Sequence, residues 1–395
     1  MQSTTTATKE RVATIDILRG VSLLGILLVN MFAFSTPVPY VDLKTYFSTP
    51  LDISYHKWLD ILVQGSFYPL FAMLFGYGLA MQQEKAERLG NNSFYKLSIK
   101  RLVVLFIIGL LHVLFLWWGD ILMMYAFCGL IAISLIRMKP QFLLAIGLLF
   151  YGAINGLVAL LAYIASLVKA SSDTFEYADI QAVQSAIKAY GSGSWMDAFQ
   201  QRLTDASVQF SPSMWIMALF TILPFMLIGA AAAKWKLIES AKSHLSKWVV
   251  AAVVLIVLGI ILKMLPYTMD RTYFLDSIQM QFGGPLLAVG YASAIILICC
   301  IPYATKILLP FAMAGRMSLT VYLLESLVCT LIFYHFGLGL YGKLGLDTIT
   351  WLALGIYAIL AVFSMFWLLI FRQGPLESLW KRITYGKFSE KRGNI

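Results

Sequence analysis

Ten apolar stretches run along this chain of 395 residues, and each is long enough to form a helix that crosses a lipid bilayer. A hydrocarbon core about 30 Å thick requires roughly 20 apolar residues of helix, whose backbone hydrogen bonds are made within the segment. We therefore predict an all-α, polytopic membrane bundle of about ten transmembrane helices. The predicted spans are 15–34, 60–81, 101–118, 120–136, 141–168, 212–233, 247–265, 283–300, 308–334 and 349–371.

The composition favours a membrane protein over a soluble one. Hydrophobic residues make up 60% of the chain and charged residues 13%, whereas a soluble domain has about 25% charged residues. No polar stretch is long enough for a soluble domain. We expect a disordered, cytoplasmic polar tail at 1–14 and a single transmembrane domain at 15–371, followed by a cytoplasmic amphipathic helix and basic tail at 372–395.

The basic residues between the spans are distributed asymmetrically, which indicates the orientation of the chain. Of 30 Lys and Arg residues, twenty lie in segments that would face the cytoplasm and seven in segments on the other side. Cytoplasmic loops of membrane proteins carry such an excess, so both termini are expected in the cytoplasm. The net charge of +10 is then a topology signal and a contact to the lipid bilayer, and nucleic acid is not an expected partner.

The longest loop on the outer side, 169–211, is predicted to be an extracytoplasmic segment with helices of its own. Its apolar residues recur every three or four positions, which indicates a short amphipathic helix that ends at 191–194 and a second helix after it. They are Ile180, Val183, Ile187 and Tyr190, and then Trp195, Phe199 and Leu203. The segment either caps an outward cavity or is a solvated spacer.

Polar residues inside the first span are the first candidates for function, because ionisable groups are costly in a membrane. Asp16 and Arg19 lie near its cytoplasmic end and Asn30 near its outer end. Arg19 and Asn30 are eleven residues apart and so share nearly the same helix face. They could form one polar stripe along the helix. Alternatively, Asp16 and Arg19 form a pair at the headgroups and Asn30 caps a helix end.

The third span contributes His112, and Asp120 follows just after the predicted hairpin turn. Imidazole is well suited to proton transfer near neutral pH, and a carboxylate beside it fixes its tautomer. The two side chains can meet only if the turn folds suitably. The alternative is a histidine bonded to a backbone carbonyl and an aspartate in contact with water.

The ninth span contains Arg316 and Glu325, which lie nine residues apart on opposite helix faces. Neither can neutralise the other, so each needs a partner on another helix or in a cavity. Glu325 is the most deeply placed acid. It is either a neutral, hydrogen-bonded carboxyl or a site for a proton or substrate. The four cysteines lack metal-ligand spacing and no zinc motif occurs, so no metal is expected.

Five segments of the chain resemble a known family. They are IDILRGVSLLGILLVNM, LFAMLFGYGLAMQ, GLLHVLFLWWGDILMMYAFCGL, GRMSLTVYLLES and FRQGPLESLW. Together they resemble the YeiB-like family of bacterial multi-pass membrane proteins. That family is in turn similar to the transmembrane acyltransferase superfamily, which includes heparan-α-glucosaminide N-acetyltransferase and the O-acetyltransferases of bacterial surface polysaccharides.

The resemblance singles out individual residues. Arg19 matches the family's Leu-Arg-Gly motif, and Arg316 matches its Gly-Arg-Met motif. His112 and Asp120 match the His and the Gly-Asp-Ile-Leu motif. Asn30 lies where relatives place a polar or His residue. Two further positions fit less closely. His56 is spaced like the outer catalytic histidine of the glucosaminide acetyltransferase, and Glu325 departs from the amide that is familiar at its position.

The resemblance implies an acyltransferase in the bacterial cell membrane. It would take an acyl group from cytoplasmic acyl-CoA or acetyl-CoA and deliver it to a hydroxyl or amine of an outer acceptor, which would be a glycan, a lipid or a small molecule. His112 or His56 would be the base, Asp120 would orient it, and Arg19 or Arg316 would hold the CoA phosphates. A transporter or flippase is the alternative, a scaffold is a third hypothesis, and a homodimer is compatible with all three.

Overall fold

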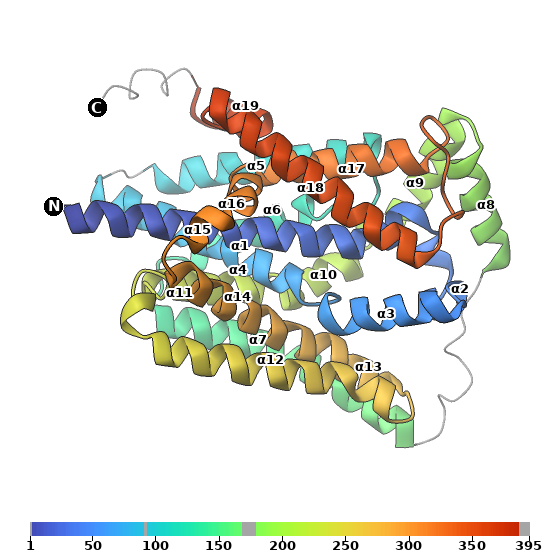
Figure 1. Cartoon of the computed structure of the whole chain (residues 1–395), viewed down its shortest axis with the longest axis horizontal. Helices are drawn as coiled ribbons and strands as arrows, with labels where there is room; N and C mark the ends of the chain where they lie inside the picture. Colours follow the sequence, from blue (N-terminus) through green and yellow to red (C-terminus); the bar gives the residue numbers. More distant parts are fainter. Residues whose placement is uncertain (1, 91–92, 168–178, 387–395) are drawn as a thin grey trace.

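The computed structural model describes residues 2–90, 93–167 and 179–386, except for the side chains of 2–12 and Lys44, and these residues form helices without strands. Both termini lie at one end of the bundle, which we call the termini end (Figure 1). The α-helices are α1 (Gln2–Ser35), α2 (Leu43–Tyr46), α3 (Pro50–Leu62), α4 (Phe67–Arg88), α5 (Phe94–Phe115), α6 (Leu122–Leu135), α7 (Pro140–Leu167), α8 (Ile180–Gly191), α9 (Trp195–Phe210), α10 (Pro212–Thr221), α11 (Leu223–Lys234), α12 (Leu245–Thr268), α13 (Tyr273–Ser277), α14 (Gly284–Cys300), α15 (Ala304–Ile307), α16 (Leu309–Arg316), α17 (Ser318–Phe333), α18 (Leu346–Ile370) and α19 (Pro375–Tyr385).

Eight helical segments of the described chain are long and apolar enough to cross a membrane, so this is a multi-pass membrane protein. They are Ala13–Ser35, Pro50–Arg88, Phe94–Phe115, Pro140–Leu167, Pro212–Lys234, Leu245–Thr268, Tyr273–Cys300 and Leu346–Ile370. Each overlaps one predicted span, and the all-α membrane bundle is confirmed. One expectation was wrong: α1 begins at Gln2, so the polar segment predicted as a disordered tail continues the first helix.

The other two predicted spans differ from a straight transmembrane helix. The predicted span 308–334 is divided into α16 and α17, which meet at an angle of 91°, and it raises the number of spans to nine if the bent pair counts as one. The predicted span 120–136 is α6, whose 14 residues extend only about 21 Å. It is short because the chain leaves α5 at Leu116 and the next helix begins only at Leu122.

Helix α1 lies at the centre of the bundle, where it packs against α4, α16, α17 and α18. Glycines allow α1 and α16 to cross in close contact. A Cβ atom added to Gly20 would lie 2.0 Å from the carbonyl oxygen of Phe311, and one added to Gly315 would lie 1.9 Å from that of Asp16. The two backbones are therefore in contact at this point. Since Arg19 and Arg316 adjoin these glycines, the crossing brings both arginines to one site.

Candidate functional site

A basic depression opens at the termini end between α1, α5, α16 and the C-terminal helix α19. We call it the vestibule, and it is lined by Asp16, Arg19, Arg101, Arg316, Arg372, Gln373, Glu377, Trp380, Lys381 and Tyr385. Arg19 pairs with Asp16 at 3.3 Å. Arg101, Arg316 and Lys381 form no ion pair with a carboxylate of the described residues. The vestibule thus holds positive charge that the surrounding protein leaves unneutralised.

The vestibule leads into an apolar cavity of about 230 Å³, which we call the chamber. The two share five lining residues: Arg19, Arg101, Arg316, Glu377 and Trp380. Beyond these, mainly apolar side chains of α1, α4, α5, α6 and α17 form the walls, among them Leu23, Phe71, Phe75, Leu102, Leu105, Leu122 and Leu319. The chamber therefore joins a cationic opening to an apolar interior.

Arg101 is held at the boundary of the two cavities. Its guanidinium donates a short hydrogen bond to the Gln82 side chain and lies 4.6 Å from the centre of the Trp380 ring. The indole N–H of Trp380 donates to the carbonyl oxygen of Arg101 at 2.8 Å. Stacking on an aromatic face orients a guanidinium without neutralising it. Arg101 is therefore positioned for an anion.

Glu377 of α19 caps the start of α17, where the ninth predicted span is broken. Its carboxylate accepts hydrogen bonds from the backbone N–H groups of Leu319 and Thr320, at 2.8 and 3.0 Å, and from the Thr320 hydroxyl at 2.6 Å. The first N–H groups of a helix lack partners within that helix. Glu377 supplies those partners to α17, so the C-terminal helix stabilises the start of a separate helix at this point.

His112 and Asp120 meet, as the sequence allowed but did not require. The His112 Nδ1 atom lies 2.9 Å from Asp120 Oδ2, and both side chains are fully buried. The backbone N–H of Met123 donates to Asp120 Oδ1 at 2.8 Å, which holds the carboxylate at the start of α6. The Nε2 atom of His112 has no hydrogen-bond partner among the described residues. One ring nitrogen is thus engaged and the other is available.

Tyr322 lies between the chamber and the histidine. It lines the chamber, and its ring centre is 5.3 Å from that of His112. Its hydroxyl accepts a hydrogen bond from the Ile121 N–H at 3.3 Å and donates to the Gly119 carbonyl at 3.5 Å. His112 itself does not line the chamber, so the Tyr322 ring links the chamber wall to the histidine.

Residues 169–178 of the predicted segment 169–211 lie outside the described residues, whereas its described part, 179–211, packs against the α5–α6 hairpin and is not a solvated spacer. Helices α8 and α9 occupy the positions that the sequence predicts. From α9, the Arg202 guanidinium donates to the Leu114 carbonyl at 2.8 Å, and the Gln209 amide donates to the Asp120 carbonyl in a short hydrogen bond. Both side chains are buried. Helix α9 therefore covers the hairpin that carries His112 and Asp120.

The buried carboxylate of Asp205 connects α8 and α9 to the chain that precedes α2. Asp205 accepts hydrogen bonds from the hydroxyls of Tyr40 and Tyr190, at 2.5 and 2.6 Å, and from the Gln201 amide at 2.8 Å. Burial raises the pKa of Asp205, and these three hydrogen bonds act in the opposite direction. Asp205 thus joins the loop before α2 to α8 and α9.

Three predicted site residues lie elsewhere. Asn30 is half-buried near the end of α1 that lies away from the termini end, and unlike Arg19 it lines neither the vestibule nor the chamber. His56 belongs to α3, and its ring centre lies 5.9 Å from that of Phe32. It also lines neither cavity. Glu325 is 2% exposed and lies one turn beyond Tyr322 on α17, and its Oε1 atom has no hydrogen-bond partner among the described residues.

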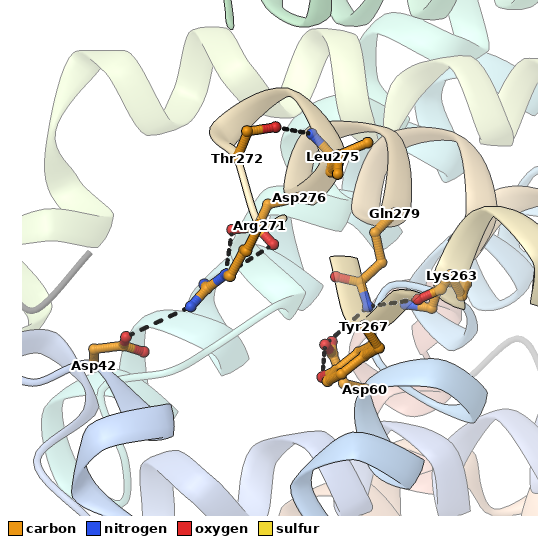
Figure 2. Close-up of polar contacts among 9 residues, drawn as sticks. All are labelled: Asp42, Asp60, Lys263, Tyr267, Arg271, Thr272, Leu275, Asp276 and Gln279. Atoms are coloured by element: carbon orange, nitrogen blue, oxygen red, sulfur yellow. Dashed lines mark hydrogen bonds and ion pairs between the residues drawn. The ribbon is translucent and has the colours of Figure 1, made fainter. Parts of the chain in front are cut away.

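A second polar cluster lies at the opposite end from the termini, between α3, α12 and the π-helix η3 (Ile278–Gly283) (Figure 2). Asp60 accepts hydrogen bonds from the Tyr267 hydroxyl at 2.6 Å and the Gln279 amide at 2.9 Å. The fully buried Lys263 donates to the Gln64 carbonyl at 2.6 Å. This cluster joins the turn between α3 and α4 to α12. It is separate from the residues that line the vestibule.

Sequence reasoning missed several residues of the site: Gln82, Arg101, Tyr322, Glu377, Trp380, Arg202 and Gln209. Arg101 was counted only as a topology signal, since it adjoins a basic loop. Glu377 and Trp380 belong to FRQGPLESLW, which contributed to the resemblance without suggesting a role. Arg202 and Gln209 lie on α9, whose contacts depend on how it packs against the rest of the bundle.

Comparison with known proteins identifies relatives along the whole chain. Residues 232–387 match the family described as "Protein of unknown function (DUF418)". The chain is 32% identical to the uncharacterized protein YxaH of Bacillus subtilis over 394 residues, 96% of each chain. It is also 32% identical to the uncharacterized protein YeiB of Escherichia coli over 396 residues, 95% of this chain and 96% of YeiB. The protein therefore belongs to the YeiB-like family of multi-pass membrane proteins.

Proposed function

We propose that this protein is a transmembrane acyltransferase that uses acyl-CoA or acetyl-CoA as its donor. One observation carries the proposal. A basic vestibule opens into an apolar chamber, and the chamber reaches Tyr322, whose ring lies 5.3 Å from the ring of the buried His112. Such a cavity suits an anionic head with a long, less polar arm, and it leads toward a candidate general base.

The dimensions of α5 support this arrangement. Arg101 at the cavity opening and His112 at the hairpin are eleven residues apart on one helix, which is about 16 Å along its axis and nearly the same face. Arginine is the side chain best suited to phosphate, because its planar guanidinium offers several N–H donors. The CoA phosphates would bind at Arg101 and Arg316, and the pantetheine arm would extend through the chamber toward Tyr322.

His112 and Asp120 would carry out the transfer. Asp120 accepts the Nδ1–H of His112 and so leaves Nε2 free to accept a proton. As the acceptor hydroxyl or amine gives its proton to Nε2, its oxygen or nitrogen forms a bond to the thioester carbonyl carbon. The C–S bond then breaks, and the CoA thiolate takes the proton back from Nε2. Tyr322 must turn aside for this step, since it separates His112 from the chamber.

The charge distribution supports a cytoplasmic location for the vestibule. The termini and the loops at their end of the bundle carry most of the basic residues outside the spans, which favours the cytoplasmic side. Acyl-CoA is a cytoplasmic metabolite, so the donor would reach the vestibule directly. The acceptor would then approach from the outer side of the bacterial cell membrane.

Binding of CoA to the purified protein tests the donor site. Arg316 makes only weak contacts, to the Arg372 carbonyl at 3.4 Å and to the Met313 sulfur at 3.7 Å, so its removal should not unfold the protein. We expect Arg316→Gln to weaken CoA binding about tenfold or more in isothermal titration calorimetry, which is about 1.4 kcal/mol. Arg19→Gln should have a similar effect.

The matched control is Arg137→Gln, because Arg137 is an exposed arginine outside the vestibule. The Arg137→Gln variant should bind CoA with the same affinity as the unmodified protein. Absence of binding at about 1 mM CoA, or equal affinity in all variants, would contradict the donor site. Solute transport that survives His112→Ala would favour the transporter hypothesis instead.

A further inference from the structure

An unusual set of buried polar atoms surrounds the α5–α6 hairpin beneath α9. Most buried polar side-chain atoms in proteins are hydrogen-bonded, and each exception calls for an explanation such as an absent ligand or water. Here four side chains that are each at least nine-tenths buried have an atom without a partner among the described residues. These atoms are His112 Nε2, Trp117 Nε1, Arg202 Nε and Gln209 Oε1.

The four side chains are neighbours through contacts with the same short stretch of chain. The rings of His112 and Trp117 are 6.3 Å apart. Arg202 bonds to the Leu114 carbonyl, and Gln209 bonds to the Asp120 carbonyl. All these contacts fall within residues 112–120, so the four side chains lie around the connection between α5 and α6.

Arg202 is the most informative member of the set. Its side chain is 1% exposed, and it forms no ion pair with any carboxylate of the described residues. Its nearest carboxylate along α9, Asp205, is engaged by Tyr40, Tyr190 and Gln201. A buried cation without a counter-ion is strongly unfavourable. The arrangement therefore indicates that an anion belongs beside Arg202.

The other three atoms match two hydroxyl groups. A hydroxyl donates one hydrogen bond and accepts others. His112 Nε2 and Gln209 Oε1 can each accept from one hydroxyl, and the Trp117 N–H can donate to either. A ligand that carries two hydroxyls and an anionic group would satisfy all four atoms.

We propose that the interface between the α5–α6 hairpin and α9 is a binding site for a phosphorylated alcohol with two hydroxyls, with Arg202 on the phosphate and the hydroxyls at His112, Trp117 and Gln209. That this ligand is the acyl acceptor rests on the proposed function. Because α9 closes these atoms off from solvent, the ligand gains access when α9 moves away from the hairpin. The phosphorylated alcohol could be a soluble molecule or the headgroup of a lipid such as phosphatidylglycerol.

Binding measurements without acyl-CoA test this site. The full-length protein in phosphatidylcholine nanodiscs is titrated with glycerol 3-phosphate, and in a parallel arm thermal unfolding is compared in phosphatidylglycerol and phosphatidylcholine nanodiscs. Binding in the first arm identifies a soluble ligand, and a higher unfolding temperature in phosphatidylglycerol identifies a lipid headgroup. In whichever arm shows binding, we expect Arg202→Gln to lower the affinity for the ligand at least tenfold or to abolish binding. Arg202→Lys should retain most of the affinity, and Trp117→Phe should lower it about fivefold.

The control is Arg271→Gln, because Arg271 is at the same end of the bundle but already pairs with Asp276 at 2.9 Å; it should leave binding unchanged. Without ligand, Arg202→Gln should unfold at a temperature no lower than the unmodified protein, since it removes an unpaired buried charge. A lower unfolding temperature with unchanged binding would mean a purely structural role and would overturn the proposal. So would a negative result in both arms. CoA titrations on the same samples report on the donor site separately, so failure of either site is distinguishable.

Discussion

The contact between His112 and Asp120 is where single residues matter most. The two lie eight positions apart on either side of a turn, and a helix of that length would separate them by about 12 Å. The turn brings Nδ1 and Oδ2 to 2.9 Å, and the Met123 N–H holds the other carboxylate oxygen. The histidine is therefore fixed in orientation with its second nitrogen available.

Replacing Asp120 by Asn is predicted to impair acyl transfer while leaving donor binding intact. An amide keeps the size of the side chain but does not enforce the Nδ1–H tautomer or stabilise the imidazolium, so the rate should fall about 100-fold or more. Single-turnover transfer of a labelled acyl group measures the rate, and CoA titration measures donor binding. The control is His244→Gln, because His244 is exposed and lies on the loop before α12. A normal rate in the Asp120→Asn variant would argue against a catalytic pair.

At the scale of elements, the informative feature is the break between α16 and α17. The backbone N–H groups of Leu319 and Thr320 bond to Glu377 rather than to carbonyls of α16, and the two helices turn through 91°. The break places Arg316 at the vestibule and directs α17 along the chamber. Helix α19 is thus part of the site, although it lies beyond the last span.

Removing the Glu377 carboxylate is predicted to destabilise this junction. Glu377→Ala loses three hydrogen bonds and a helix cap, so the free energy of unfolding should fall by about 1–3 kcal/mol. Hydrogen exchange should also become faster at the start of α17. Glu377→Gln should lose less, since its amide oxygen still accepts.

Ser378→Ala, at an exposed neighbouring position, serves as the control for Glu377→Ala and should match the unmodified protein in denaturant unfolding. If Glu377→Ala also shows an unchanged free energy of unfolding and unchanged exchange, the helix break does not depend on α19.

At the scale of the whole molecule, the two ends of the bundle differ in chemistry. The termini end carries the basic vestibule, whereas α8 and α9 lie at the opposite end (Figure 1). The chamber joins the first end to the His112 hairpin, and the proposed acceptor site lies on the other side of that hairpin. A donor and an acceptor could thus meet at one histidine from opposite sides of a membrane.

Labelling of introduced cysteines is predicted to confirm this orientation. All four native cysteines lie in helices of the spans or in α6 and α17, so they can be replaced by alanine or serine for the assay. Ser192→Cys, in the exposed turn between α8 and α9, should react with an impermeant maleimide on intact bacteria. Ser246→Cys, exposed at the termini end, should react only after the membrane is permeabilised. The reverse pattern would place the vestibule outside and exclude cytoplasmic CoA as its ligand.

The class of protein, the helical segments and most of the charged candidate residues can be predicted from the amino-acid sequence alone. The length of an apolar stretch and the number of Lys and Arg residues beside it are local properties of the chain. The thickness of the bilayer and the positive-inside rule relate them directly to membrane spans and orientation. The motifs likewise singled out Arg19, Arg316, His112 and Asp120 before any contact was known. The resemblance to the YeiB-like family is confirmed along the chain.

Which of these residues lie together is visible only in the folded protein. Lipid is as apolar as the helix faces, so hydropathy does not specify which helices are neighbours; close packing and hydrogen bonds do. Trp380 meets Arg101 across 279 positions of sequence, and Gln209 meets Asp120 across 89. Asn30, which shares a helix face with Arg19, lines neither the vestibule nor the chamber. The site is thus a product of helix packing, which no local pattern in the chain encodes.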